Sequence, residues 1–413
     1  MSVSLRSAIA RDRRHLIDLA ASIIRIPTVN PPGAHYPACV AQLDQMTRAA
    51  GLETRVVRVP HAAVMRELPD AAECPRALVI GRWDVGAART VHFNAHYDVV
   101  PAAATGWKFG PFEPRVSQGW LYGRGSADMK GSIACVLHAV TVLRKLGITP
   151  KVNVEVSWTP DEETDSTFGV QWLVRKKLLD ADYAIVCEGG SGRHVGCGHN
   201  GVLWFEVDVH GRAAHGSEPH RGINAVEQMS ALVLDLKDYA RELAGRTFRN
   251  PDGRIRSATI NVGGVTATQD GGKINTVPGA VTFTLDRRVL PNENLAEAER
   301  HLRAYIRGAA RRIPRLRVTV RKINQHTSTF SDPSGPFPRA FAAALARVRG
   351  QSTKFTVSTG FNDSHFFAGE AGLPTIGWGP GGESCHGTDE RVRVSELVQA
   401  AQAYAEFIAT FAG

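Results

Sequence analysis

The sequence predicts an α/β fold in which a mostly parallel sheet forms a large split domain and a compact α+β sandwich is inserted into it. Through residues 1–198, strand-like apolar runs alternate with segments of helical periodicity, which is typical of a parallel sheet covered by helices on both faces. Between residues 199 and 322 the order changes to β-α-β-β-α-β. The alternating pattern returns in residues 323–413. We therefore expect residues 1–198 and 323–413 to form one domain and residues 199–322 to form the other.

The helix expected at residues 129–146 is the clearest element of the first part. Ile133, Leu137 and Val140 recur at helical spacing along one face, and Gly147 ends the helix. The same reasoning predicts helices at 5–26, 40–50 and 168–179, and strands at 76–83, 90–95, 152–158 and 183–187.

The inserted segment begins with a half-buried strand, because apolar and polar residues alternate over residues 203–209. A long amphipathic helix is expected at 224–243, followed by strands at 257–262 and 280–287, a helix at 295–310 and a strand at 316–322. Beyond it we expect a helix at 339–348, a strand at 375–378 and a last helix at 395–411, for which Ser395 is the predicted N-cap.

The composition is that of an ordinary globular protein. Of the 413 residues, 43% are hydrophobic and 22% are charged, which excludes a disordered chain. No apolar run approaches the roughly 18 residues of a membrane span, so we expect no membrane insertion. Charged residues between Arg11 and His15 interrupt the apolar core that an export signal needs. The six cysteines contain no C-x-x-C pair, which indicates reduced thiols and a cytoplasmic protein.

The chain is basic, with 49 Lys and Arg against 40 Asp and Glu and a net charge of +9. The densest basic cluster, residues 300–322, follows a helix–strand pattern with aliphatic spacing. No groove-reading or aromatic-interleaved motif accompanies the charge, so we expect no nucleic-acid partner. An ordinary solvated surface or a cationic cleft for a carboxylate substrate fits better.

Candidate chemical groups follow the predicted strands. His96 and Asp98 lie two residues apart at a strand end, so an extended backbone points both side chains the same way, and an Asp that accepts the second N–H of a His fixes the tautomer that binds a metal. A turn Asp beside a surface His is the plainer interpretation. Asp128 lies in a glycine-rich loop directly before a helix, where it could also be a simple N-cap.

Three adjacent carboxylates, at 161–163, follow the strand expected at 152–158, and their mutual repulsion is costly unless cations hold them. Neighbouring side chains of an extended chain point opposite ways, so one Glu can bind a metal while the other acts as a base. Glu188 follows another buried strand, and His386 follows a Gly/Pro-rich loop. Ligands gather at the carboxyl edge of such sheets, and this donor set suits two Zn²⁺, Co²⁺ or Mn²⁺ ions that share a carboxylate.

The motifs, taken together and in order, resemble the M20 metallopeptidases and amidohydrolases, the group of acetylornithine deacetylase, succinyl-diaminopimelate desuccinylase, aminoacylase and the glutamate carboxypeptidases. They read N-A-H-Y-D-V-V-P, G-R-G-S-A-D-M-K-G, P-D-E-E-T, C-E-G-G and C-H-G-T-D-E. The resemblance covers nearly the whole chain. It implies a zinc-peptidase-like catalytic domain, 1–198 with 323–413, and an inserted lid or dimerisation domain, 199–322.

The resemblance also implies a role for each metal-site position. Asp128 would bridge both ions, and the peptide bond after it would be cis. His96 and Glu188 would complete one ion's site, and Glu163 and His386 would complete the other.

Further roles follow from the same resemblance. Glu162 would be the general base and Asp98 would orient the metal-binding His. In the inserted domain, His215 would stabilise the oxyanion, often in the partner subunit's site, while Asn275 and Arg288 would contact the substrate.

Gly360 lies in a segment that corresponds to one near the substrate in relatives. The implied enzyme is a hydrolase with two divalent metal ions, zinc with cobalt or manganese as alternatives. It would cleave an amide C–N bond of a small carboxylate-bearing substrate of the N-acyl amino acid type. A homodimer through the inserted domain is the implied assembly. Release of ammonia from a small aromatic or heterocyclic amine, dipeptidase or carboxypeptidase activity, and a non-enzymatic metal-binding scaffold remain open.

Overall fold

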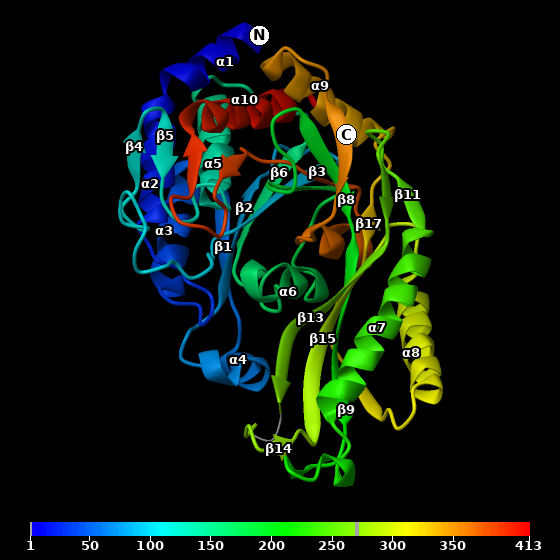
Figure 1. Ribbon diagram of the computed structural model, residues 1–413. Coiled ribbons are helices and arrows are strands. Elements are labelled where there is room, and N and C mark those ends of the chain that lie inside the picture. The colour runs from blue at the N-terminus through cyan, green and yellow to red at the C-terminus, as the bar shows by residue number, and fades with distance from the viewer. Residues whose placement is uncertain (1, 269–271) are drawn as a thin grey trace. The chain divides into compact units, whose positions relative to one another are not determined.

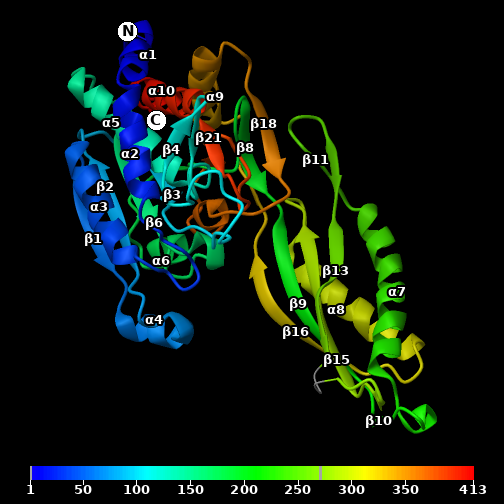
Figure 2. The same ribbon diagram turned by 60° about the vertical axis from the view of Figure 1, so that its left-hand side comes forward.

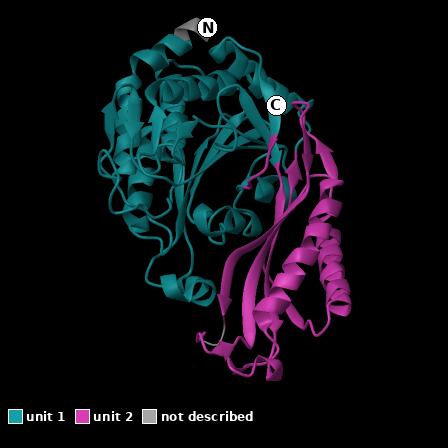
Figure 3. Cartoon of the chain, in the orientation of Figure 1, with its two compact units in different colours: residues 1–198, 331–356, 362–413 teal, residues 199–330, 357–361 magenta. Residues whose placement is uncertain are grey.

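The computed structural model describes residues 2–268 and 272–413, which divide into two compact units (Figure 3). Unit 1 comprises residues 1–198, 331–356 and 362–413, and unit 2 comprises residues 199–330 and 357–361. The expected inserted domain ended at residue 322. The compact unit extends to Phe330, because strand β16, Val318–His326, belongs to the unit 2 sheet over its whole length, and the short β17, Thr329–Phe330, follows it in the chain.

Unit 1 is built on a mixed sheet with a parallel block at its centre (Figure 1). The strands run in the order β1-β2-β6-β3-β7-β19-β8. Neighbours from β6 to β19 are parallel, whereas β1 and β2 are antiparallel to their neighbours. The bounds are β1 Glu53–Arg58, β2 Ala77–Trp83, β3 Thr90–His96, β6 Asn153–Thr159, β7 Tyr183–Val186, β8 His194–His199, β18 Lys354–Ser358 (paired with β8) and β19 Thr375–Gly377. The predicted α/β fold class is confirmed.

Helices cover both faces of this sheet, which explains why β2, β3 and β6 are buried along almost their whole length. Val79 of β2 packs into the core beneath one set of helices, whereas Leu78 and Ile80 pack into the core on the opposite face. The first set comprises α1 Ser2–Arg11, α2 Arg13–Ile24, α3 Tyr36–Ala49, α5 Lys130–Lys145, α9 Pro336–Arg349 and α10 Val394–Thr410. On the other face lie α4 His61–Glu67 and α6 Val170–Arg175.

A small antiparallel sheet, in the order β20-β21-β5-β4, was not predicted. It joins β4 Arg115–Ser117 and β5 Trp120–Tyr122 to β20 Gly382–Glu383 and β21 Arg391–Arg393. The sheet therefore ties the chain before Asp128 to the chain on either side of His386.

Unit 2 has the predicted β-α-β-β-α-β order. Its antiparallel strands run β13-β15-β9-β16, and α7 and α8 pack on one face (Figure 2). The bounds are β9 Gly201–His210, α7 Ala225–Ala244, β13 Thr259–Thr268, β15 Ala280–Val289 and α8 Leu295–Arg312, with short pairs β10 Ala214–His215 with β14 Thr276–Val277 and β11 Thr247–Arg249 with β12 Ile255–Ser257.

Three local predictions were wrong. The helix expected at 5–26 is two helices, interrupted at Asp12, and the helix expected at 168–179 forms only as α6. Ser395 is not the N-cap, because α10 begins one residue earlier and Arg393 occupies the cap position. None of the six cysteines, all of which lie in the described residues, forms a disulfide bond. Within the described residues, no helix combines the length and apolarity that crossing a membrane requires.

Candidate active site

Three neighbouring parallel strands bring candidate residues to one edge of the unit 1 sheet. β3 lies between β6 and β7 and is parallel to both. His96 is the last residue of β3, Glu162 and Glu163 form a turn just beyond β6, and Glu188 follows β7. Since parallel strands share their carboxyl edge, side chains from distant parts of the sequence meet there.

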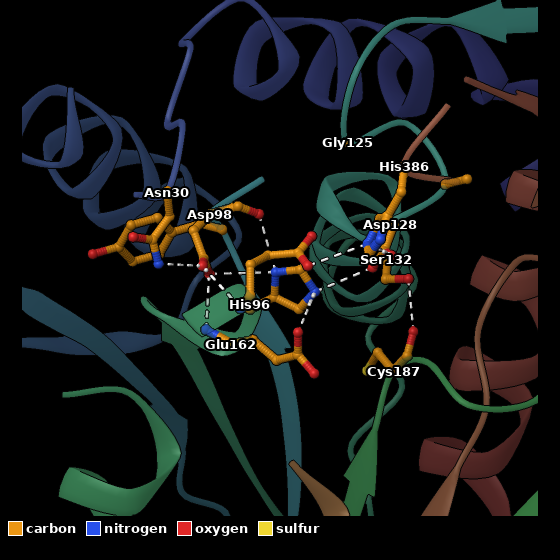
Figure 4. Close-up of polar contacts among 12 residues, drawn as sticks. Asn30, His96, Asp98, Gly125, Asp128, Ser132, Glu162, Cys187 and His386 are labelled. Carbon is orange, nitrogen blue, oxygen red and sulfur yellow. Dashed lines mark hydrogen bonds and ion pairs between the residues drawn. The ribbon is translucent and has the colours of Figure 1, made fainter. Parts of the chain in front are cut away.

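Asp128 and His386 reach the same place from loops (Figure 4). Asp128 Oδ1 lies 3.2 Å from His96 Nε2, and Asp128 Oδ2 lies 3.3 Å from His386 Nε2. His386 Nε2 is also 3.2 Å from Glu163 Oε2. Asp128 thus stands between two histidines, and the peptide bond after it is cis.

The other nitrogen of His96 is held by Asp98. His96 Nδ1 lies 3.0 Å from the Asp98 main-chain oxygen and 3.4 Å from Asp98 Oδ1. The proton of the neutral His96 ring is therefore best placed on Nδ1. That tautomer leaves the Nε2 lone pair directed at the carboxylates. His96 and Asp98 are both buried.

Asp98 also fixes the turn that carries the two glutamates. Its Oδ1 accepts the Glu162 backbone N–H at 3.3 Å, and its Oδ2 accepts that of Glu163 at 3.2 Å. Asn30 Nδ2 donates to Oδ2 at 3.0 Å. One carboxylate therefore orients both a histidine and the neighbouring acidic turn.

Glu390 holds the Asp128 loop in place, a role that the sequence did not reveal. Its carboxylate is fully buried and accepts backbone N–H groups from Gly125, Ala127 and Asp128 at 2.9–3.1 Å. Arg124 Nη1 donates to its Oε2 at 2.6 Å. Because Glu390 lies four residues after His386, it links the loops of two candidate ligands. The only sequence signal was its place in C-H-G-T-D-E, since its partners are mainly backbone groups.

The donor set fits divalent cations. Ligand atoms of His96, Asp128 and Glu163 lie within 4.8 Å of one another. Buried in the same region, Glu188 Oε1 has no hydrogen-bond partner among the described residues. Imidazole nitrogens and carboxylate oxygens are ligands that zinc and similar ions prefer.

Crowding perturbs the titration of these groups. Burial, with the charge of Glu188 next, raises the pKa of Glu162 well above its usual range. Burial and nearby carboxylates such as Asp128 raise the pKa of Glu188 to about 8. Hydrogen bonds to Asp128 and Glu163 raise the pKa of His386 to about 10. Negative charges packed this closely require compensating positive charge, which bound cations would supply.

Glu162 lies apart from the hydrogen bonds that join the other candidates. Its Oε2 is 4.0 Å from His96 Nε2, and its side chain is 16% exposed, so the carboxylate borders the cluster and still reaches solvent. Asp363 was not predicted as a site residue. It is buried and accepts a hydrogen bond from Ser166, and its charge contributes to the raised pKa of Glu162.

In unit 2, His215 and Asn275 are brought together. His215 pairs with Thr276 across β10 and β14, and Gly216 N–H donates to the Asn275 carbonyl at 2.7 Å. The Ser217 backbone N–H donates to His215 Nδ1 at 3.2 Å, which places the ring proton on Nε2. Both side chains are exposed.

Arg288 lies on β15, and its Nε and Nη2 both donate to Asp286 Oδ2, at 3.1 and 2.9 Å. Its guanidinium also lies 6.0 Å from the Phe361 ring centre. Gly360 is exposed, and its N–H donates to Ser358 Oγ at 3.1 Å.

A model of peptidase family M20/M25/M40 matches residues 92–410, a span that contains all these candidates. The chain belongs to this family. Members of it are metal-dependent hydrolases of amide bonds, and this M20 chain is therefore a hydrolase that acts on amide bonds with divalent metal.

Relatives span almost the whole M20 chain. It is 31% identical over 406 residues to a succinyl-diaminopimelate desuccinylase of Gluconacetobacter diazotrophicus, covering 96% of this chain and 97% of the relative. A metallo-carboxypeptidase from Sulfolobus solfataricus has the same fold, with a TM-score of 0.76 at 18% identity and coverage of 95% and 98%. A dipeptidase from Saccharomyces cerevisiae gives 0.75 at 16% identity and covers both chains fully.

Proposed function

We propose that this M20 chain removes the acyl group from a small N-acyl amino acid by hydrolysing its amide bond. The observation that carries the proposal is the convergence of His96, Asp128 and Glu163 beside the partly exposed Glu162. The 31% identical desuccinylase supports an N-acyl substrate rather than a longer peptide.

Two divalent ions, zinc by preference with cobalt or manganese as substitutes, would be held by the cluster. Asp128 would be shared, His96 and Glu188 would hold one ion, and Glu163 and His386 the other. Ions bound there would lower the pKa of water and polarise the substrate carbonyl. Asp98 keeps the His96 lone pair directed inward, and so prepares the site before an ion arrives.

Glu162 moves the proton. Its Oε2 accepts a proton from the attacking water and then delivers it to the leaving nitrogen, as a general base that becomes a general acid. A carboxylate with a raised pKa suits both steps, because it can accept the proton and also release it.

Unit 2 would supply the groups that bind the substrate. The Nε2–H of His215 would donate to the oxyanion, since Nδ1 already accepts from Ser217. Arg288 would bind the substrate carboxylate through the guanidinium N–H groups that do not bind Asp286, and Asn275 and Gly360 would contact the substrate. We further propose a homodimer through unit 2 and a cytoplasmic location.

The experiment compares substrate classes and metals. The metal-free enzyme is reconstituted with Zn²⁺, Co²⁺ or Mn²⁺ and offered N-succinyl and N-acetyl amino acids, dipeptides, and small aromatic amines. We expect hydrolysis of N-acyl amino acids into an acid and an amine, lost on chelation and restored by metal. Cleavage of dipeptides alone, or release of ammonia from the amines, would contradict the proposal.

A further inference from the structure

Unit 2 carries a row of arginines that the proposed function does not use. Arg303, Arg307 and Arg311 recur every four residues of α8 and so share one face of the helix. They belong to the basic cluster at residues 300–322. These arginines line a hollow of about 330 Å³, and its other lining residues are apolar and come from α8 and β16: Ile306, Ala310, Val318 and Val320.

Much of the charge in this row is uncompensated. Arg303 is bound, with Nε 2.8 Å from Glu299 Oε1 and Nη1 donating to the Val320 carbonyl at 2.9 Å. In the part of the chain that the structure describes, no carboxylate pairs with Arg307 or Arg311, and none lines the hollow. Like charges four residues apart destabilise a helix, and the helix dipole favours a basic residue only in the last turn, which accounts for Arg311 but not for Arg307.

The other side of the hollow is formed by an edge strand of the unit 2 sheet. β16 is the last strand in the order of the unit 2 sheet. The His210 N–H donates to the Arg317 carbonyl at 2.9 Å, so residue 317 directs its backbone groups toward β9. Directions alternate along an antiparallel strand, so Val318 and Val320 direct theirs away from β9. The bond from Arg303 to the Val320 carbonyl agrees with this direction.

We propose that this hollow binds an extended acidic segment of another polypeptide, which pairs with the β16 edge and directs alternate carboxylates at the arginine row. Residues four apart on a helix rise by about 6 Å, and every second side chain of a strand by about 7 Å, so the two spacings match. Val318 and Val320 pack toward the α8 core, and an added strand directs half of its side chains to that same layer.

The chemistry of the hollow favours polypeptide over other anions. No aromatic ring lines it, so the bases of a single-stranded nucleic acid have no surface on which to stack. A second copy of this chain docked in the same way would place the arginine rows opposite each other. An acidic strand supplies carboxylates for the guanidinium groups and backbone partners for Val318, whose backbone groups point away from β9.

The test uses the full-length, metal-loaded enzyme and a fluorescent eight-residue peptide of alternating Glu and Val. Fluorescence anisotropy is expected to show saturable binding that weakens with salt. The double variant Arg307→Glu/Arg311→Glu should weaken this binding by about tenfold or more while amide hydrolysis stays unchanged. Val318→Pro, which removes an N–H that points away from β9, should weaken it as well.

Matched controls separate this site from general attraction of anions. The variant Arg241→Glu/Arg300→Glu makes the same charge change at exposed positions outside the hollow and should bind the peptide normally. Peptides of alternating Lys and Val, or of four Glu followed by four Val, should bind at least about tenfold more weakly. Equal binding of all three peptides, equal loss in both double variants, tighter binding of a single-stranded oligonucleotide, or no binding would overturn the proposal.

Discussion

The groups proposed for catalysis are held in different ways in the two units. In unit 1, His96 and Asp98 are buried and linked to each other, to Asn30 and to the acidic turn. In unit 2, His215 and Asn275 are exposed and have only local partners. A cluster of like charges therefore needs hydrogen bonds that hold each group in place, whereas a substrate-binding donor needs only a fixed tautomer and access to its ligand.

Replacing Glu162 with Gln should produce the largest loss. It removes the proton acceptor while the hydrogen bonds of Asp98 to the turn remain, so kcat should fall by about 10²–10⁴ with metal content unchanged. Glu163→Gln is the matched variant and should instead weaken metal binding. Near-normal turnover in Glu162→Gln, or equal metal loss in both variants, would break the distinction between base and ligand.

His215→Ala tests the exposed group of unit 2. Loss of one oxyanion donor should lower kcat by about 10²–10³-fold. The free energy of unfolding and the metal content should stay unchanged, because the exposed side chain has few contacts to lose. His220→Ala, an equally exposed neighbour, is the control. If the site is shared in a dimer, mixing His215→Ala with Glu162→Gln chains should restore activity; no recovery would indicate a site built in one chain.

Glu390→Ala tests the hydrogen bonds that hold the Asp128 loop of unit 1 in place. Three backbone N–H groups and the buried Arg124 lose their acceptor, and the Asp128 loop loses its anchor. Calorimetric titration of the metal-free protein should show zinc affinity weakened by about 10–100-fold. Glu383→Ala, which removes an exposed partner of Arg391, should leave the affinity as it is. Equal affinities in the two variants would contradict the anchoring role.

The last expected effect is on stability rather than on activity, and it concerns His138, a buried residue of α5. Burial lowers its pKa to about 4, from an ordinary value near 6.5. The unfolded chain therefore takes up a proton between these pH values that the folded chain does not. The contribution of neutral His138 to the free energy of unfolding is present above about pH 6.5. It is lost as the pH falls toward 4, by about 3 kcal/mol at most.

His138→Leu should reduce that pH dependence. Urea unfolding of the metal-free protein at pH 7.5 and pH 5 measures it, with the exposed His61→Leu as control. An unchanged difference between the two pH values would show that His138 is not its source.

The sequence predicted the parts of the site that follow from strand ends. His96 ends a buried strand, and Glu163 and Glu188 each follow one. Parallel strands share an edge, so the meeting of these residues could be anticipated. The support provided by Glu390 could not be anticipated. Glu390 binds backbone N–H groups more than 260 positions away, and almost every residue type has a backbone N–H group.

The fold shows the same limit. Buried elements such as β3 and α5 were predicted because their apolar periodicity is strong. β1 was not predicted, since this edge strand is partly exposed along its length and its residues show no clear alternation. The small sheet of β4, β5, β20 and β21 was also missed, because two- and three-residue strands carry too little periodicity to recognise.

Anomalous diffraction at the zinc edge, from crystals of the zinc-loaded enzyme, directly tests the proposed pair of metal ions around Asp128. We expect two strong peaks, both beside Asp128. One should lie next to His96 and Glu188, and the other next to Glu163 and His386. A single peak away from Asp128, or none within this cluster, in crystals that retain full activity would contradict the proposed pair.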